Sequence, residues 1–372
     1  MKNARPVAFY APLKSPNHPL PSGDRTMARL TMKALDRAGY SPCLTSEVRT
    51  LDKAGDRQRQ ERLRAESLEE ADRLIARYTA LPGDSRPCLW FTYHVYYKAP
   101  DWIGPHVAEA LGIPYVIAEG SRASRRAQGP WALGHEGAQA ALDRADVIFS
   151  MTPVDREALE TARPSHQALV DLPPFLDLEE WPLSGSRPSR APEPRLLTVA
   201  MMREGDKLAS YRILAAALGR LLHLPWSLDI VGDGEARDEI ARLFSSMQNR
   251  VRLHGQVECK ADLAALYRAA DLFVWPAVNE AYGMVLLEAQ ALGCAVVAGA
   301  YGGVASVVRN GETGLLTSPG DIAAFAGSMS GLLQDRERLG TFGANASRFV
   351  EQERDLGHAA LRLRNALQGL TG

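Results

Sequence analysis

The chain has 372 residues, of which 46% are hydrophobic and 23% are charged, and its formal net charge is −1. This composition is typical of a globular protein, and the length predicts two domains. A net charge close to zero argues against a protein that coats nucleic acid, so we expect no nucleic-acid partner.

Apolar strands alternate with helical segments along the chain, and this alternation predicts a doubly wound α/β architecture. A stretch rich in Pro, Ser and Gly at 183–194 has no periodicity, so we expect the domain boundary there. The predicted helix at 52–79 mixes arginines with glutamates, which favours a solvated face over a membrane anchor. In this first half the strands are predicted at 7–10, 87–93, 114–118 and 147–151, and the other helix at 24–38.

The second half repeats the same alternation. Two α/β halves of similar size joined by one linker imply a cleft between them, and ligand pockets favour domain interfaces. Strands are predicted at 196–200, 228–231, 251–254, 271–275, 294–298 and 314–317, and helices at 207–222, 261–270, 283–292, 303–309, 321–334 and 350–369.

Targeting and cysteine patterns carry little signal. The N-terminus lacks the long apolar core of a signal peptide, and no run of 18 apolar residues occurs. We therefore expect a cytoplasmic protein, and a peripheral contact with the inner face of the membrane is compatible with that expectation. The four cysteines form no C-x-x-C pair, so neither a zinc site nor a disulfide framework is predicted.

The segment 279–289 is the most informative one. The apolar run before it, which ends at Pro276, is typical of a buried parallel strand, so Glu280 falls at a strand end and Glu288 in the early turns of a helix. Ligands of open α/β sheets bind at such strand ends. Gly283 permits a left-handed backbone, and the free N–H groups at the helix start would face an anion. The structural alternative is a solvated Glu280 and a capping Glu288.

Other strand ends carry polar residues too. Arg203 and Lys207 follow the strand at 196–200, and Gly232-Asp233-Gly234 follows the strand at 228–231. Taken alone, the Arg and Lys are best explained by a solvated surface loop. The order of the motifs changes that interpretation.

In this order the motifs resemble those of the GT-B glycosyltransferases, specifically the retaining family 4 of nucleotide-sugar enzymes, also described as glycosyl transferases group 1. That family has an Arg and a Lys after one strand, a Gly-x-Gly after the next, and a Pro, a Glu, an aromatic-Gly pair and a second Glu after a third. A Gly-Gly pair and a Gly-x-x-Gly-Leu-Leu follow. The matching residues here are Arg203, Lys207, Gly232, Gly234, Pro276, Glu280, Tyr282, Gly283, Glu288, Gly302, Gly303, Gly311 and Gly314.

The resemblance implies the GT-B fold, in which two Rossmann-like α/β/α domains face each other across a cleft. Residues 1–182 would form the acceptor-binding domain and 183–194 the linker. Residues 195–350 would bind the nucleotide sugar, and 351–372 would form a C-terminal helix that crosses back to the N-terminal domain.

The implied activity is transfer of a sugar from a nucleoside diphosphate sugar, UDP- or GDP-linked, to a hydroxyl of a carbohydrate, lipid-linked or small-molecule acceptor. Retention of configuration, and no need for a metal or other cofactor, belong to the same expectation. Arg203 and Lys207 would stabilise the departing diphosphate. Glu280 would fix the donor sugar, and Glu288 would accept hydrogen bonds from the ribose. The other expected donor-binding residues are Gly23, Gly232, Gly234, Val257, Tyr282, Gly283, Met284 and Val285.

By the same resemblance, the first half would bind the acceptor. His94 matches a histidine that many relatives place in the cleft, where it would polarise or deprotonate an acceptor hydroxyl. A satisfied structural histidine is the alternative. Glu119 stands where a second family histidine is absent, and it is an expected acceptor contact together with Arg122. The basic stretch 122–126 near Trp131 would meet an anionic acceptor or a membrane surface, or is simply a solvated loop.

The chain departs from the family pattern in several places. Residues 174–177 read Pro-Phe-Leu-Asp where the family has Asn-Gly-x-Asp. Met201 and Met202 stand where a Gly-Arg pair is usual, which displaces Arg203, and Ser306 stands where a Glu is common. Base, sugar and acceptor identity therefore stay open, as does the oligomeric state. The alternatives are a nucleotide-sugar epimerase or glycoside phosphorylase on the same fold, and a non-catalytic nucleotide-sugar-binding protein. An NAD enzyme is disfavoured, because no G-x-G-x-x-G follows the first strand.

Overall fold

The computed structural model describes residues 5–182 and 193–371. By its internal contacts the chain divides into two compact units. Unit 1 comprises Met1–Pro173 together with Leu356–Gly372, and unit 2 comprises Pro174–Asp355. Of the linker expected at 183–194, residues 183–192 lie outside the described residues.

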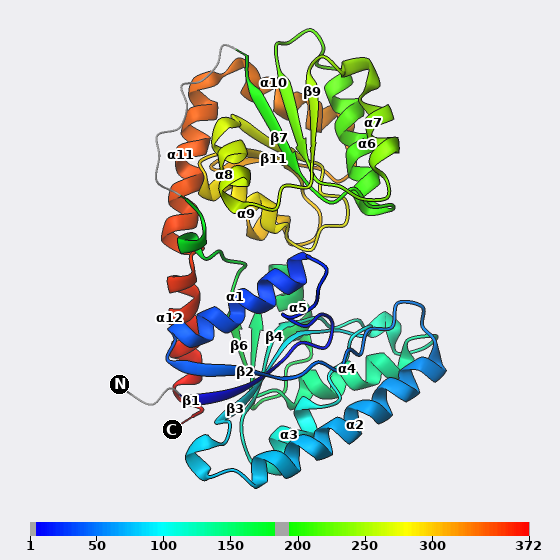
Figure 1. The fold of residues 1–372 in the computed structure, drawn as a ribbon, viewed down its shortest axis with the longest axis vertical. Coiled ribbons are helices and arrows are strands. Elements are labelled where there is room, and N and C mark those ends of the chain that lie inside the picture. Colours follow the sequence, from blue (N-terminus) through cyan, green and yellow to red (C-terminus); the bar gives the residue numbers. More distant parts are fainter. Residues whose placement is uncertain (1–4, 183–192, 372) are drawn as a thin grey trace. The chain divides into compact units, whose positions relative to one another are not determined.

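Unit 1 is built on a six-stranded sheet in the order β2-β1-β3-β4-β5-β6, with every neighbouring pair parallel. The inner strand β3 buries side chains on both faces, and its Trp90 and Phe91 are fully buried. Such burial is expected for a sheet covered by helices on both sides. Helices α2, α3 and α4 contact one another, and α12 packs against α1 (Figure 1). The strands are β1 (Arg5–Tyr10), β2 (Tyr40–Ser46), β3 (Leu89–Val95), β4 (Tyr115–Gly120), β5 (Val147–Ser150) and β6 (Ala168–Asp171), and the helices are α1 (Gly23–Arg37), α2 (Arg57–Thr79), α3 (Gly104–Leu111), α4 (Ala132–Arg144), α5 (Pro153–Thr161) and α12 (Leu356–Leu367).

Unit 2 repeats the plan with a parallel sheet in the order β12-β11-β10-β7-β8-β9. Helix α6 packs against α7 and α10, and α9 packs against α11. The prediction of two Rossmann-like α/β domains is therefore confirmed. The strands are β7 (Arg195–Val199), β8 (Ser227–Val231), β9 (Val251–Gly255), β10 (Leu272–Trp275), β11 (Ala295–Gly299) and β12 (Gly314–Thr317), and the helices are α6 (Asp206–Gly219), α7 (Arg237–Leu243), α8 (Lys260–Ala269), α9 (Met284–Ala291), α10 (Ile322–Gln334) and α11 (Arg336–Glu353).

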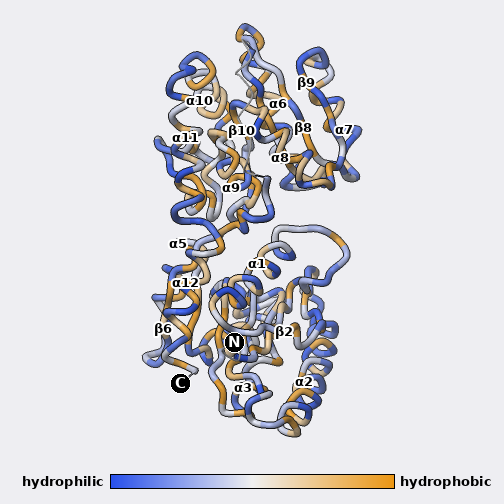
Figure 2. The backbone as a smooth tube through the Cα atoms, turned by 60° about the vertical axis from the view of Figure 1, so that its left-hand side comes forward, coloured by the Kyte–Doolittle hydropathy of each residue, from blue (hydrophilic) through white to orange (hydrophobic). Residues whose placement is uncertain are grey.

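Helix α2 is the long charged helix, and it begins later than the predicted residue 52. Asp56 is its N-cap and accepts a hydrogen bond from the amide of Arg59 at 3.1 Å, which fixes the start at Arg57. Hydrophilic and hydrophobic residues alternate along it in Figure 2, and its buried stripe is narrow, so the mixed charges face solvent. No helix in the described part of the chain is long and apolar enough to cross a bilayer.

Two helix predictions in the last third are wrong. The segment 303–309 contains only a short 3-10 turn at Val304–Ser306. The predicted helix 350–369 is two helices, because the backbone between α11 and α12 pairs with another segment: the amide of Leu176 donates to the carbonyl of Arg354 at 2.8 Å. Helix α11 was not predicted, although Asp335 caps its N-terminus by accepting from the amide of Arg338.

Candidate functional site

The loop that follows β10 in unit 2 holds a strained backbone. Ala277 and Asn279 have φ angles of 57° and 51°, in the left-handed region, which costs a residue other than glycine about 1–3 kcal/mol. Contacts from α6 hold this conformation. Ser210 accepts a hydrogen bond from the amide of Val278 at 2.9 Å, and Asp206 accepts one from the side chain of Asn279 at 2.9 Å. The first turns of α6 therefore fix the loop that carries Glu280.

Glu280 and Lys207 form an ion pair at the carboxyl end of β10. The Lys207 ammonium also lies 5.5 Å from the centre of the Trp275 ring, and the indole N–H of Trp275 donates to Glu280 Oε2 at 3.4 Å. The side chains of Lys207 and Glu280 are 25% and 18% exposed. Two of the predicted catalytic residues are thus brought together, with one face open to a ligand that would compete for the ammonium.

Helix α9 begins four residues after Glu280, and its N-terminus is suited to binding an anion. Its N-cap is Gly283 with φ 74°, and no side chain caps the helix. The amide of Leu286 donates to the Gly283 carbonyl at 2.9 Å, which leaves the amides of Met284 and Val285 without an acceptor within the helix. The Gly-Gly pair holds the preceding backbone in place. The amide of Gly303 donates to the carbonyl of Ala281 at 2.6 Å, and a Cβ on Gly302 would lie 2.3 Å from the carbonyl oxygen of Glu280.

Glu288, one turn into α9, is held by a partner that the sequence did not suggest. Tyr267 of α8 donates its hydroxyl to Glu288 Oε2 at 2.9 Å. Burial raises the pKa of Glu288, and the hydrogen bond from Tyr267 opposes that rise. One carboxylate oxygen is therefore oriented by Tyr267, which suits a carboxylate that must accept hydrogen bonds from a ligand in a fixed direction.

The two glycines of Gly232-Asp233-Gly234 allow a close backbone approach. A Cβ on Gly232 would lie 1.9 Å from the carbonyl oxygen of Ala200, and one on Gly234 would lie 2.3 Å from that of Met202. The amide of Met202 donates to the carbonyl of Asp233 at 2.9 Å, which continues the pairing of β7 with β8 past the strand ends. These contacts explain why the segment that replaces the family's Gly-Arg still turns tightly into α6.

Arg203 and Val257 are two further donor residues that the sequence predicts in unit 2. Arg203 is exposed just before α6, and its guanidinium makes no ion pair with any described residue. Val257 is half-buried in the loop after β9.

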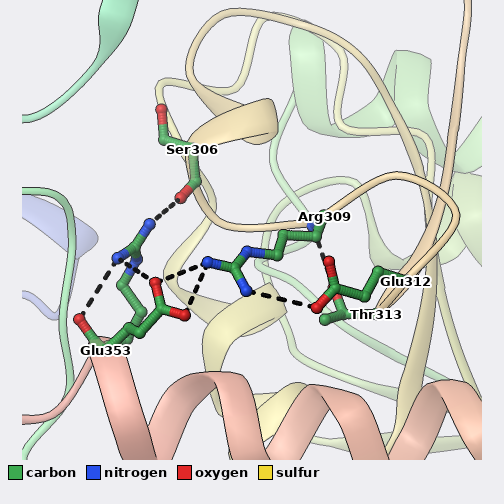
Figure 3. Close-up of polar contacts among 6 residues, drawn as sticks. Ser306, Arg309, Glu312, Thr313 and Glu353 are labelled. Carbon is green, nitrogen blue, oxygen red and sulfur yellow. Dashed lines mark hydrogen bonds and ion pairs between the residues drawn. The ribbon is translucent and has the colours of Figure 1, made fainter.

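The stretch around Ser306 is tied to the end of α11 by arginines (Figure 3). Both Nη2 contacts of Arg309 with the Glu353 carboxylate measure 2.7 Å, and Arg309 also pairs with Glu312 at 3.4 Å. Arg354 donates to the backbone carbonyl of Ser306 at 3.2 Å. Ser306 therefore contributes its carbonyl to this network, while its buried hydroxyl has no hydrogen-bond partner among the described residues.

Unit 1 brings His94 and Glu119 together at the carboxyl edge of its sheet. Each has a left-handed backbone, with φ angles of 64° and 61°. His94 Nδ1 lies 3.4 Å from Glu119 Oε1 and 3.2 Å from Asp24 Oδ1. The hydroxyl of Tyr93 donates to Glu119 Oε2 at 2.6 Å. Sequence reasoning missed Asp24 and Tyr93, although an acid in the first turn of the helix after β1 was a usable signal for Asp24.

The charges of these neighbours set the protonation of His94. Burial lowers its pKa, but the carboxylates of Glu119 and Asp24 outweigh burial and raise the pKa to about 9. Burial raises the pKa of Glu119. Burial would also raise the pKa of Asp24, yet the hydrogen bond with His94 prevails and lowers it. The ring is therefore protonated at neutral pH, so of the two predicted roles the donating, polarising one fits the structure better than proton abstraction.

The remaining predictions for unit 1 have mixed outcomes. Gly23 is the first residue of α1, and a Cβ there would meet no atom within 4 Å, so the space in front of it is open. Arg122 directs its guanidinium to α4, where it bonds Gln139 and pairs with Asp143 at 2.6 Å. These contacts tie Arg122, which lies in the loop after β4, to α4, so the structure gives no support for a role in binding the acceptor.

Most of unit 2 is similar to a known protein family. Residues 193–335 match the family model described as glycosyl transferases group 1. A D-inositol 3-phosphate glycosyltransferase of Rhodococcus opacus is 30% identical over 66% of this chain and 52% of its own length. The enzyme of the same name from Thermobispora bispora is 35% identical over 44% of this chain and 36% of its own length. The chain thus spans about half, or less, of the length of these curated relatives.

Solved structures share the fold across nearly the whole chain. Sucrose-phosphate synthase from Thermosynechococcus elongatus matches with a TM-score of 0.73 at 20% identity, over 98% of this chain and 99% of that one. Anabaena HepE, solved in complex with UDP, matches with a TM-score of 0.72 at 16% identity, over 98% and 100%. These neighbours have the GT-B glycosyltransferase fold. Residues 193–335 of this chain are therefore similar to the glycosyl transferases group 1 family.

Proposed function

We propose that this protein is a retaining glycosyltransferase that moves a sugar from a nucleoside diphosphate sugar to an acceptor hydroxyl without a metal ion. The observation that carries the proposal is the Lys207–Glu280 pair beside Trp275, at the strand end that precedes the uncapped start of α9. A lysine ammonium and free helix amides suit a departing diphosphate. A carboxylate at the same point suits the hydroxyls of the sugar that the diphosphate leaves behind.

Each donor residue has a distinct task in this proposal. Lys207 stabilises the negative charge that develops on the leaving diphosphate, and Arg203 has a free guanidinium fork for the same anion. Glu280 fixes the donor sugar. Glu288, oriented by Tyr267, accepts hydrogen bonds from the ribose hydroxyls. The UDP in the Anabaena neighbour supports a UDP-sugar as the first donor to test.

The acceptor hydroxyl is proposed to lie beside His94 and Glu119 in unit 1. The imidazolium donates a hydrogen bond, and the carboxylates nearby accept from hydroxyls. The relatives are named D-inositol 3-phosphate glycosyltransferases, which supports a hydroxyl-rich acceptor for this chain. Attack on the same face as the leaving phosphate retains the configuration, and catalysis is then mainly positioning and stabilisation of the leaving group.

A donor panel tests the proposal. Purified protein is mixed with UDP-, GDP-, ADP- and TDP-sugars, with and without EDTA, and release of the free nucleoside diphosphate is followed over time. We expect slow release with one donor, unchanged by EDTA, and a raised melting temperature with that donor's nucleotide. Lys207→Ala should lose the release, whereas Lys53→Ala, an exposed lysine of unit 1, should keep it. Tight binding of a nucleotide sugar without any turnover would favour the non-catalytic alternative.

A further inference from the structure

Two cations and two aromatic rings form a cluster in unit 1 that the proposed chemistry does not use. The Lys98 ammonium lies 5.6 Å from the ring centre of Tyr97 and 5.4 Å from that of Trp131. The Arg126 guanidinium lies 5.3 and 5.1 Å from the same two rings. The rings meet edge to face at 5.8 Å. Arg126 is exposed and the other three residues are half-buried, so the cluster is open to solvent. We call these four residues the cation–ring cluster.

The two positive charges of the cation–ring cluster form no ion pair among the described residues. Neither Lys98 nor Arg126 has a carboxylate within 4.0 Å in the part of the chain that the structure describes. Asp52, whose carbonyl accepts from the Trp131 indole at 3.2 Å, turns its carboxylate instead to the Gln60 side chain at 2.7 Å. Two like charges held over the same rings repel each other. An anion bound between them would replace this repulsion with attraction to both cations.

The cation–ring cluster is connected to the candidate acceptor site by a row of rings. The ring of His94 lies 5.1 Å from that of Tyr96, which lies 5.5 Å from that of Tyr97. Tyr96 is half-buried. A ligand that contacts His94 at one end would therefore pass over aromatic surface and reach the two cations at the other.

We propose that the cation–ring cluster binds a phosphate or diphosphate group of the acceptor, whose reacting hydroxyl lies beside His94. The assignment rests on the proposed glycosyltransferase function. Arg126 offers a planar fork to two phosphate oxygens, and Lys98 offers a point charge. Tyr97 and Trp131 hold both cations in place, so less side-chain freedom is lost on binding. The phosphate is carried either by a soluble sugar or polyol or by a lipid, and the experiment separates the two sources.

The test uses the full chain with saturating UDP, so that the donor diphosphate site is filled. Binding of inorganic pyrophosphate is measured by calorimetry, and binding to phosphatidylglycerol and to phosphatidylcholine vesicles by co-sedimentation. The variants are Lys98→Gln and Arg126→Gln, singly and together. The matched control is Arg125→Gln, which removes the same charge from the neighbouring residue. The side chain of Arg125 is exposed and makes no ring contact among the described residues.

We expect the double variant to weaken pyrophosphate binding at least tenfold, and Arg125→Gln to change it less than twofold. Loss of pyrophosphate binding alone identifies a soluble phosphorylated acceptor. A parallel, cluster-dependent loss of binding to the anionic vesicles identifies a lipid-borne phosphate. The proposal is overturned if neither probe binds, or if Arg125→Gln has the same effect as the double variant. Failure of UDP, GDP, ADP and TDP alike to bind at the outset would instead contradict the proposed function.

Discussion

The protonation of His94 gives the sharpest prediction of pH dependence. Its pKa is about 9 in the folded chain against an ordinary value of 6.5, chiefly because the charges of Glu119 and Asp24 overcome burial. Since the folded pKa is the higher of the two, the stabilisation is fully present below pH 6.5 and is lost as the pH rises towards 9. The shift corresponds to about 3 kcal/mol at 1.36 kcal/mol per pKa unit. The imidazole is only 15% exposed, so solvent screening reduces this figure little.

The assay compares urea unfolding of the wild type and His94→Gln at several pH values between 5.5 and 9.5. His106→Gln, which changes an exposed histidine of α3, is the control. We expect the difference in unfolding free energy between wild type and His94→Gln to shrink by about 3 kcal/mol across this range, and His106→Gln to follow the wild type. An NMR titration of the His94 ring should give a midpoint well above 6.5. A wild-type curve that parallels His94→Gln at every pH would refute the reasoning.

Three further outcomes are expected in unit 2. Gly302→Ala should destabilise the protein by about 1–3 kcal/mol in chemical unfolding, because its φ is 48° and the new Cβ would meet the Glu280 carbonyl; Gly327→Ala, a helical glycine with open space around it, should be neutral or stabilising. Glu288→Gln should weaken nucleotide binding by roughly tenfold in calorimetry, and an unchanged affinity would remove Glu288 from the ribose site. Tyr267→Phe should cause a smaller loss of the same kind, since it only frees one carboxylate oxygen.

The sequence predicts the inner strands of both sheets well, because strands such as β4, β10 and β11 are buried throughout and stand out as apolar runs. The edge strands β2 and β6 were not predicted, because exposed and polar positions interrupt their apolar pattern. Gly232 and Gly302 were picked out only through the order of the family motifs, and the structure shows that a Cβ at either position would meet a backbone carbonyl. The break between α11 and α12 could not be foreseen. It arises because Leu176, far away in the sequence, pairs with the backbone at 354–355.

Of the candidate site, the sequence suggested the residues of the Lys207–Glu280 and His94–Glu119 pairs and missed several of their partners. Lys207 and Glu280 were found through an ordered motif, but their contact with Trp275 depends on a side-chain orientation that no spacing encodes. Asp24 acts with Glu119 to raise the pKa of His94, yet Asp24 and His94 are 70 positions apart. Arg122 was assigned to the acceptor from its charge alone, and charge does not reveal that Asp143 of the same unit pairs with it.

The account depends most directly on Lys207 as the group that stabilises the leaving diphosphate. The measurement is the rate of nucleoside diphosphate release from the accepted donor sugar, for the wild type and for Lys207→Ala, with the unfolding free energy of both proteins determined alongside. We predict a fall in rate of about 10²–10³-fold with a change in stability of about 1 kcal/mol or less, since the ion pair is partly exposed. Full activity in Lys207→Ala would contradict the account.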